Sequence, residues 1–301
     1  MIRSETIEWL LAGDPAIAFQ ARRDLLGTTN GSLQSRIADE GWGKVFLDAA
    51  TPEAGWGRAY YAPKWISTHY TLYDLRLLEL PPANALARRA VARVLRENHA
   101  KGGGVINDTC VNGMFLDIAA WFGAPDADLR RIVDYILARQ IADGGFNCDI
   151  ERRAVHHSSM HTTICVLEGF RTYEQQGYDY RIDEIRRMAD EAREFLLTHR
   201  LFRARRTGAV INDDFLRFPV PPRYKYNVLR ALDHFRAAGL QRDPRMDEAL
   251  DIVISRRKPD GRWHATSLMS GLLHQQMEKA GQPGRWPTLI AMRVLAHFGA
   301  D

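Results

Sequence analysis

Three residues whose side chains can bind a metal or transfer a proton lie at matching positions in successive apolar segments. His69, Cys110 and His161 each stand near the start of such a segment, and Asp108 lies just ahead of Cys110. A carboxylate, a thiolate and an imidazole form a zinc ligand set, and three protein ligands with one open position are typical of a catalytic zinc site. A bound Zn²⁺ lowers the pKa of the thiol or water molecule that it holds. The pattern therefore favours a zinc site that activates a thiol or a water molecule.

Each of these residues also has an ordinary structural interpretation. His69 and His161 are typical of satisfied core or helix-capping histidines, and Cys110 of a small buried apolar residue. Asp108 precedes an apolar helix, where a carboxylate commonly caps the free amides of the first turn. The shared position in successive segments is what favours the metal site over these alternatives.

The segments around these residues carry the periodicity of helices. Apolar residues recur at steps of three and four in 85–95, 129–141, 182–197 and 246–254. Gly and aromatic residues cluster between helices, as in Asp143-Gly144-Gly145-Phe146 and Asp260-Gly261-Arg262-Trp263. Most clusters recur at about 40 to 60 residues, a period that indicates repeated helical hairpins. The second helices of these hairpins are predicted at 65–80, 108–122, 159–172, 224–237 and 286–298.

The second helices are apolar on nearly all sides, which is typical of buried helices. An inner ring of such helices within an outer ring of amphipathic ones predicts an all-α fold, a closed α/α toroid of five to six helical hairpins. Residues 5–26 form a divergent sixth unit, and Val105-Ile106-Asn107-Asp108 recurs as Val210-Ile211-Asn212-Asp213. We expect residues 1–301 to form a single toroid domain. The starts of its inner helices converge on one mouth, where the candidate ligands meet.

The composition excludes several classes of protein. The 301 residues are 46% hydrophobic and 26% charged, with a formal net charge of only +4. Basic and acidic residues are interspersed, so we expect no nucleic-acid partner and interpret the many Arg side chains as solvated. No apolar run reaches the about 18 residues of a membrane span. Cys110, Cys148 and Cys165 do not make a disulfide framework, so we expect reduced thiols in a cytoplasmic protein, with Cys148 and Cys165 as bystanders.

The repeats and their Gly-aromatic turns resemble the terpenoid cyclase and protein prenyltransferase superfamily of α/α toroids. Within it, Asp108-Thr109-Cys110, followed in a later inner helix by His161-Thr162-Thr163, is similar to the zinc site of protein prenyltransferase β subunits. The resemblance implies Asp108, Cys110 and His161 as ligands of Zn²⁺. The chain departs from that family at 102–107, where basic residues that hold an isoprenoid diphosphate are missing and only the neighbouring Lys101 is charged.

The principal hypothesis is a zinc-dependent, prenyltransferase-like enzyme, a transferase or hydrolase acting on an apolar, peptide-like or thiol-containing substrate in the barrel. His69 serves in it as a fourth ligand or as a catalytic acid or base. Tyr224, Lys225 and Tyr226 open a predicted inner helix and are candidates for substrate binding. A prenyltransferase also needs a separate partner subunit, and the sequence does not determine the oligomeric state.

Two other functions stay open. The first is a non-catalytic toroid that binds a lipid or a peptide without a metal. The second is a carbohydrate-active toroid, which would use a pair of carboxylates in its mouth. Its candidate carboxylates are Asp149, Asp213 and Asp214.

Overall fold

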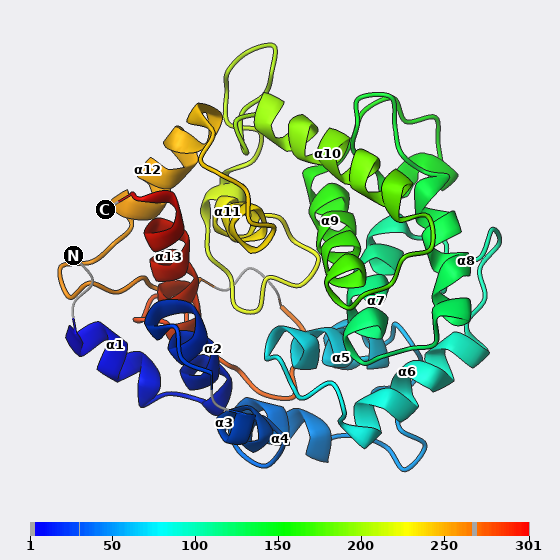
Figure 1. Cartoon of the computed structure of the whole chain (residues 1–301), viewed down its shortest axis with the longest axis horizontal. Coiled ribbons are helices and arrows are strands. Elements are labelled where there is room, and N and C mark those ends of the chain that lie inside the picture. Colours follow the sequence, from blue (N-terminus) through cyan, green and yellow to red (C-terminus); the bar gives the residue numbers. More distant parts are fainter. Residues whose placement is uncertain (1–3, 30, 267–269, 301) are drawn as a thin grey trace.

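A computed structural model describes residues 4–29, 31–266 and 270–300 of the chain. In this part the regular elements are all helices, and β-pairing is limited to isolated bridges. The helices form a ring around a central axis (Figure 1). The prediction of an all-α toroid is confirmed.

The ring has two layers of helices (Figure 1). The inner layer comprises α2 (Pro15–Leu26), α5 (Thr68–Leu77), α7 (Thr109–Trp121), α9 (Met160–Gln175), α11 (Val228–Ala237) and α13 (Arg285–Phe298). The outer layer comprises α1 (Ser4–Leu11), α3 (Gly31–Ser35), α4 (Gly41–Asp48), α6 (Ala85–Glu97), α8 (Asp126–Leu137), α10 (Ile182–Thr198) and α12 (Asp247–Ser255). Short 3₁₀ turns lie in the connections: η1 (Arg36–Ala38), η2 (Lys64–Ile66), η3 (Cys148–Glu151), η4 (Asp213–Leu216) and η5 (Pro244–Met246).

The predicted second helices coincide with the inner layer, and their starts are set by capping residues. Ser67 accepts a hydrogen bond from the amide of Tyr70 at the start of α5, and Asn227 does the same for the amide of Arg230 in α11. Such caps satisfy amides that have no partner within the helix. The caps explain why α5 and α11 begin a few residues later than the apolar pattern alone indicates.

The Gly-aromatic turns have the same hydrogen bonds in three repeats. The amide of the aromatic residue donates to a threonine hydroxyl near the start of the following inner helix, at 2.9 Å from Trp56 to Thr68 and at 3.0 Å from Trp263 to Thr288. The corresponding distance from Phe146 to its threonine is 3.1 Å. Each turn therefore fixes the start of the inner helix that follows it.

The helices α7 and α9 approach each other unusually closely because glycines face each other between them. A Cβ atom added to Gly169 would lie only 2.4 Å from the backbone oxygen of Gly113. No real side chain fits at that distance. The contact lets the backbones of these two inner helices pack directly against each other.

One expectation about the inner layer needs correction. Its helices are largely buried, but they also carry charged side chains inside the ring. Arg76, Glu168, Arg230 and Arg293 are each at most 9% exposed. These Arg side chains are therefore not solvated, and they define the candidate site described below. No helix in the described part of the chain combines the length and apolarity needed to cross a bilayer.

Candidate functional site

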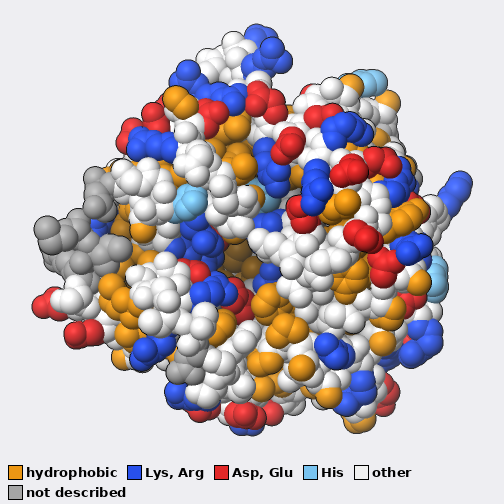
Figure 2. Space-filling model, viewed as in Figure 1, with side chains coloured by type: hydrophobic (Ala, Val, Ile, Leu, Met, Phe, Trp, Pro, Cys, Tyr) orange, Lys and Arg blue, Asp and Glu red, His pale blue; other side chains and the backbone are white. Residues whose placement is uncertain are grey.

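The inner helices surround a cavity of about 340 Å³, which lies beside the carboxyl-terminal halves of α2, α5, α7 and α9. Figure 2 shows a hollow near the centre of the molecule, with basic and acidic side chains around it. The six arginines and five carboxylates that line the cavity are Arg23, Arg76, Arg171, Arg230, Arg236 and Arg293 with Asp24, Glu79, Asp117, Glu168 and Asp233. Trp121, Trp286 and Phe218 add apolar surfaces to this wall.

Arg230 of α11 is the most extensively bonded of the cavity arginines. Its Nε donates to Oε1 of Glu168 at 2.9 Å, and its Nη2 donates to the hydroxyl of Tyr73 at 2.7 Å. Its Nη1 donates to the backbone oxygens of Arg223 and Lys225 at 2.6 and 2.8 Å. Burial acts to raise the pKa of Glu168, but attraction to Arg230 outweighs it, and the pKa is lowered. Glu168 is therefore a carboxylate at neutral pH.

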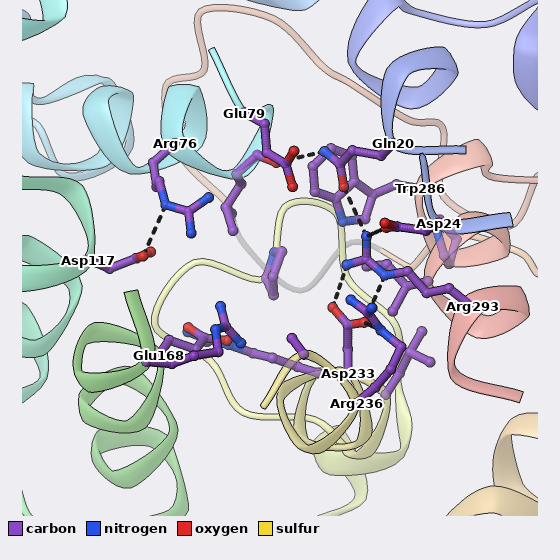
Figure 3. A pocket seen from close by; sticks show the side chains of 18 of the residues that line it. Gln20, Asp24, Arg76, Glu79, Asp117, Glu168, Asp233, Arg236, Trp286 and Arg293 are labelled. Atoms are coloured by element: carbon purple, nitrogen blue, oxygen red, sulfur yellow. Dashed lines mark hydrogen bonds and ion pairs between the residues drawn. The ribbon is translucent and has the colours of Figure 1, made fainter. Parts of the chain in front are cut away.

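A second group of ion pairs joins three inner helices across the cavity wall (Figure 3). Nη1 of Arg293 donates to Asp24 at 2.8 Å and to Gln20 at 3.0 Å, while its Nε donates to Asp233 at 2.7 Å. Arg236 donates to the same Asp233 oxygen at 2.8 Å. Burial acts to raise the pKa of Asp233, but the two arginines hold it well below its usual range. These contacts tie α2, α11 and α13 together.

Arg76 holds the wall on the opposite side of the cavity. Its Nε donates to Asp117 at 3.0 Å and its Nη2 donates to the hydroxyl of Thr172 at 3.1 Å. The guanidinium carbon lies 4.2 Å from the ring centroid of Trp121, a cation–π contact. Two buried partners, Asp117 and Thr172, therefore fix the guanidinium of Arg76 in place against the indole of Trp121.

Arg171 differs from the other cavity arginines. None of the described carboxylates forms an ion pair with it, and its Nη1 lies 3.4 Å from Nδ1 of His234. Burial lowers its pKa, although the charges of Glu168 and Asp117 act against this. An arginine stays charged at neutral pH. Its donors are therefore the ones most available to a ligand in the cavity.

Asp74 and Arg223 form an incompletely bonded pair in the interior of the ring. Nη2 of Arg223 lies 3.3 Å from Oδ2 of Asp74, and both side chains are 4% exposed. Oδ1 of Asp74 and Nε and Nη1 of Arg223 have no hydrogen-bond partner among the described residues. Burial raises the pKa of Asp74 to about 6, although the charge of Arg223 acts to lower it. Buried polar atoms without partners cost about 1–3 kcal/mol each, so a water molecule or ligand group would be held tightly here.

The residues predicted from the sequence lie at the other end of the inner helices, where the helices start. His69 is fully buried, with its Nδ1 at 2.8 Å from the hydroxyl of Tyr60. Its Nε2 has no partner among the described residues. Burial lowers the pKa of His69 to about 3, so the imidazole is neutral at physiological pH. It is not part of the metal-ligand group found in the described residues, and its catalytic role stays a prediction.

His161 also lies outside that group. Its Nδ1 accepts a hydrogen bond from the amide of Tyr226 at 2.8 Å, and its ring packs edge-on against Phe215 at 5.3 Å. Burial, together with the charges of Arg230 and Lys225, lowers its pKa to about 4. The structure therefore gives His161 a role in anchoring the loop before α11.

Asp108 and Cys110 do come together, but their third companion is Cys148. One ligand atom from each of these three residues lies within 4.8 Å of the others. Asp108 forms no capping bond with α7; its carboxylate instead accepts from Nη2 of Arg152 at 2.9 Å. A hydrogen bond to Cys148, with burial, raises the pKa of the Cys110 thiol. From the sequence we expected Cys148 to be a bystander. Its turn, η3, belongs to the repeat next to the one that contains Cys110, and this brings the two thiols together.

The three residues proposed for substrate binding do not share one environment. Tyr226 is buried, and its hydroxyl donates to the backbone oxygen of Leu201 at 2.5 Å, as expected for a packing residue. Tyr224 is half-buried and stacks on Trp65, with ring centroids 6.2 Å apart. Lys225 is also half-buried, with its Nζ 3.7 Å from Asp214. Tyr224 and Lys225 stay candidates for a contact at the rim.

The carboxylates first considered for carbohydrate chemistry do not line the cavity. Asp149 pairs with Arg153 and, at 3.4 Å, with Arg152. Asp213 is exposed, and Asp214 lies 3.3 Å from Arg217. Four of the five cavity carboxylates lie within inner helices, and the fifth, Glu79, follows the end of α5. An acidic residue inside a mainly apolar helix was the signal in the sequence that could have pointed to the four.

Comparisons with known proteins bear on the fold. No protein family description and no curated protein matches the sequence. Among solved structures, the chain is similar to a glycosyl hydrolase family 88 protein from Bacteroides vulgatus, with 12% identity, a TM-score of 0.58 and 97% of each chain covered. It is also similar to a polysaccharide lyase, with 11% identity, a TM-score of 0.55 and coverage of 98% of this chain and 96% of the other.

These findings correct the resemblance drawn from the sequence. The similar structures are toroids named for acting on carbohydrates, so the assignment to the prenyltransferase superfamily and the zinc-dependent transferase function are wrong. The physical reason is that hairpin repeats and Gly-aromatic turns specify a ring of helices rather than a reaction. The Asp-x-Cys motif was the more specific signal, and its intended partner His161 bonds elsewhere.

Proposed function

We propose that the protein is a carbohydrate-active enzyme that binds a saccharide in the central cavity. The observation that carries the proposal is the cavity wall itself, in which guanidinium and carboxylate groups alternate beside two indole rings. Saccharide hydroxyls both donate and accept hydrogen bonds, so they need acceptors and donors side by side. Aromatic faces suit the apolar faces of sugar rings. The carbohydrate-acting names of the similar structures support the same conclusion.

The cavity is prepared for such a ligand before binding. Arg230 and Arg293 are fixed by bonds to other inner-helix residues, so they lose little side-chain entropy when a ligand arrives. Arg171 is the cavity arginine without a carboxylate partner among the described residues. We assign it the first direct contact with the saccharide.

Cleavage of a glycosidic bond needs a group that exchanges a proton near neutral pH. Glu168 and Asp233 do not qualify, because arginines keep their pKa values low. Asp74 has a pKa of about 6 and an oxygen without a partner. Perturbed carboxyl groups of this kind are common at catalytic sites. Asp74 is not among the residues that line the cavity, but it lies on α5 two residues before Arg76, which does line it. We assign proton transfer to Asp74 through a water molecule between its carboxyl group and the saccharide, with Arg223 setting the orientation of that carboxyl group.

One observation favours a second candidate function, a saccharide-binding protein without catalysis. All five carboxylates of the cavity wall form an ion pair with an arginine: Asp24, Glu79, Asp117, Glu168 and Asp233. A cavity whose own carboxylates are all neutralised in this way is suited to binding rather than to acid catalysis. In that function Asp74 has no role in turnover.

The experiment combines activity and binding on the purified full-length chain. A panel of neutral and acidic polysaccharides is incubated with the protein, and new reducing ends and unsaturated products are quantified separately, which distinguishes hydrolysis from elimination. The proposal expects cleavage of at least one polysaccharide and loss of turnover in Asp74→Asn with binding retained. Binding without cleavage by the native protein supports the second function, and absence of both refutes the proposal.

Arg171→Met tests the cavity as the binding site. A hydrogen bond to a charged group contributes about 1.5–3 kcal/mol, so we expect affinity for the oligosaccharide to fall roughly 10- to 100-fold. Calorimetric titration measures the effect. Arg186→Met is the matched control, because Arg186 is an exposed α10 residue paired with Glu174. Equal affinities for the two variants would place the saccharide elsewhere.

A further inference from the structure

Asp108, Cys110 and Cys148 form a group that the proposed carbohydrate chemistry does not use. Asp108 occupies the cap position of α7, Cys110 is the second residue of that helix, and Cys148 begins the turn η3. One ligand atom from each lies within 4.8 Å of the other two. We call these three residues the thiol–carboxylate cluster.

The cluster is held by hydrogen bonds from residues around it. Sγ of Cys148 accepts from the amide of Cys110 at 3.0 Å and from the hydroxyl of Thr162 at 3.3 Å. Arg152 donates to one oxygen of Asp108 at 2.9 Å, which fixes the orientation of the carboxylate. Such outer contacts are a regular feature of metal sites, where they orient the ligands. The two sulfur atoms and the carboxylate are therefore already close together, and no large conformational change is needed for them to bind one cation.

The charges around the cluster suit a divalent cation. Asp149 adds a second carboxylate beside it through its ion pair with Arg152, and Arg153 adds a second guanidinium. With both thiols deprotonated, four negative groups face two positive ones. A divalent cation bound there brings the net charge of this group to zero.

We propose that Asp108, Cys110 and Cys148 bind a thiophilic divalent cation such as Zn²⁺. Two thiolates and one carboxylate are accepted zinc ligands, and three protein ligands leave a fourth position for water. All three residues are partly exposed, so a cation can reach them from solvent. The ligand set differs from the one expected from the sequence, because Cys148 takes the place of His161.

The cation would bind at a different level of the ring from the saccharide. Asp117 of the cavity is nine residues further along α7 than Asp108, a separation of roughly 13 Å along the helix axis. The cation would join η3 to the start of α7, at the amino-terminal ends of the inner helices. The cation site therefore shares no residue with the proposed saccharide site, and each of the two proposals can be wrong without affecting the other.

The test uses the full-length protein, purified under reducing conditions and freed of metal with a chelator. Titration with Co²⁺ should give thiolate-to-cobalt charge-transfer absorption that saturates at one equivalent, and Zn²⁺ should displace it. Cys148→Ser and Cys110→Ser should each weaken Zn²⁺ binding at least about tenfold, since even changes in outer contacts of metal sites cost that much. His161→Gln and Cys165→Ala, which alter residues outside the cluster, should bind Zn²⁺ like the native chain.

Several results would overturn the proposal. Undiminished Zn²⁺ binding by Cys148→Ser would do so, as would loss of binding in His161→Gln. A Cys110–Cys148 disulfide in protein purified without reductant, together with no metal uptake after reduction, would instead identify a redox pair. Circular dichroism and urea unfolding show whether each variant folds. If Cys148→Ser does not fold, the cobalt spectrum of the native chain and the Cys110→Ser variant decide the question.

Discussion

Glu168→Gln should destabilise the protein strongly, because it leaves a buried guanidinium without its anion. Arg230 is 6% exposed, and its Nε and Nη2 both donate to Glu168. Breaking a buried ion pair by removing one partner costs about 3–5 kcal/mol. Gln retains an oxygen that can accept one of the two bonds, so we expect a value near 3 kcal/mol, about the lower end of that range.

Equilibrium unfolding in urea measures this effect, with the slope m compared between variants to confirm that the same surface unfolds. Glu194→Gln is the matched control. Glu194 also pairs with an arginine, Arg245, at 2.6 Å, but its side chain is 58% exposed. Exposed pairs contribute about 0–1 kcal/mol. The two variants make the same chemical change in opposite surroundings.

Acidification gives a second measurement of the same interaction. The pKa of Glu168 is lower in the folded protein than in the unfolded chain. Its stabilising contribution is therefore complete above about pH 4.5, the unfolded value, and is lost as the pH falls toward the folded value. The stability difference between native and Glu168→Gln protein should shrink on acidification. A cost below about 1 kcal/mol at pH 7 would refute the reasoning. So would a double variant, Glu168→Gln with Arg230→Met, that is no more stable than Glu168→Gln alone.

Two further substitutions test the packing and the interior of the ring. Gly169→Ala should destabilise the protein by roughly 1–3 kcal/mol, because its Cβ meets the oxygen of Gly113 at 2.4 Å; Gly31→Ala, with open space around it, should not. Asp74→Asn should leave stability unchanged near pH 4 and raise it by up to roughly 3 kcal/mol at pH 7. The folded pKa of Asp74 is raised to about 6, so native stability falls as the pH rises through that value. Urea unfolding at both pH values measures this, and a flat difference between pH 4 and pH 7 would contradict it.

The ring of helices could be predicted from the sequence because its signals are local. Apolar helices, glycine turns and their spacing recur in the chain, and each turn forms its hydrogen bonds within one repeat, as between Trp56 and Thr68. The position of a residue along the axis of the ring could be predicted for the same reason, because it follows from where each inner helix starts. His69, Cys110 and His161 do lie at the starts of inner helices.

The direction in which each side chain points could not be predicted in this way. Residues at the same level along the ring axis contact different neighbours. A small rotation of a helix about its own axis is enough to change which neighbour a given side chain contacts. His161 turns toward the amide of Tyr226, whereas Cys148 reaches the start of α7 from a connecting turn. Cys148 lies outside every predicted helix, so the alignment of helix starts excluded it from consideration.

The buried arginines show where composition misled the interpretation. A count of 41 basic against 37 acidic residues gives a small net charge and suggests a solvated surface. Arg76, Arg230 and Arg293, however, lie between apolar residues within the inner helices α5, α11 and α13. Burial of a charge is expensive unless it is paired and hydrogen-bonded. Each of these arginines is therefore matched to a carboxylate on another inner helix, which is a relation between distant segments that no local pattern records.

That arrangement also bears on why the charges are inside the ring at all. Well-packed apolar residues of the same size often serve stability as well as a buried ion pair does or better. A chain that retains several such pairs around one cavity, together with an incompletely bonded Asp74, therefore has a reason other than stability to keep them. Saccharide recognition is a sufficient reason, because it requires polar groups held rigidly in a cavity that water leaves on binding. If Asp74→Asn raises the free energy of unfolding while it abolishes turnover, the loss of stability in the native protein and its catalytic activity both come from Asp74.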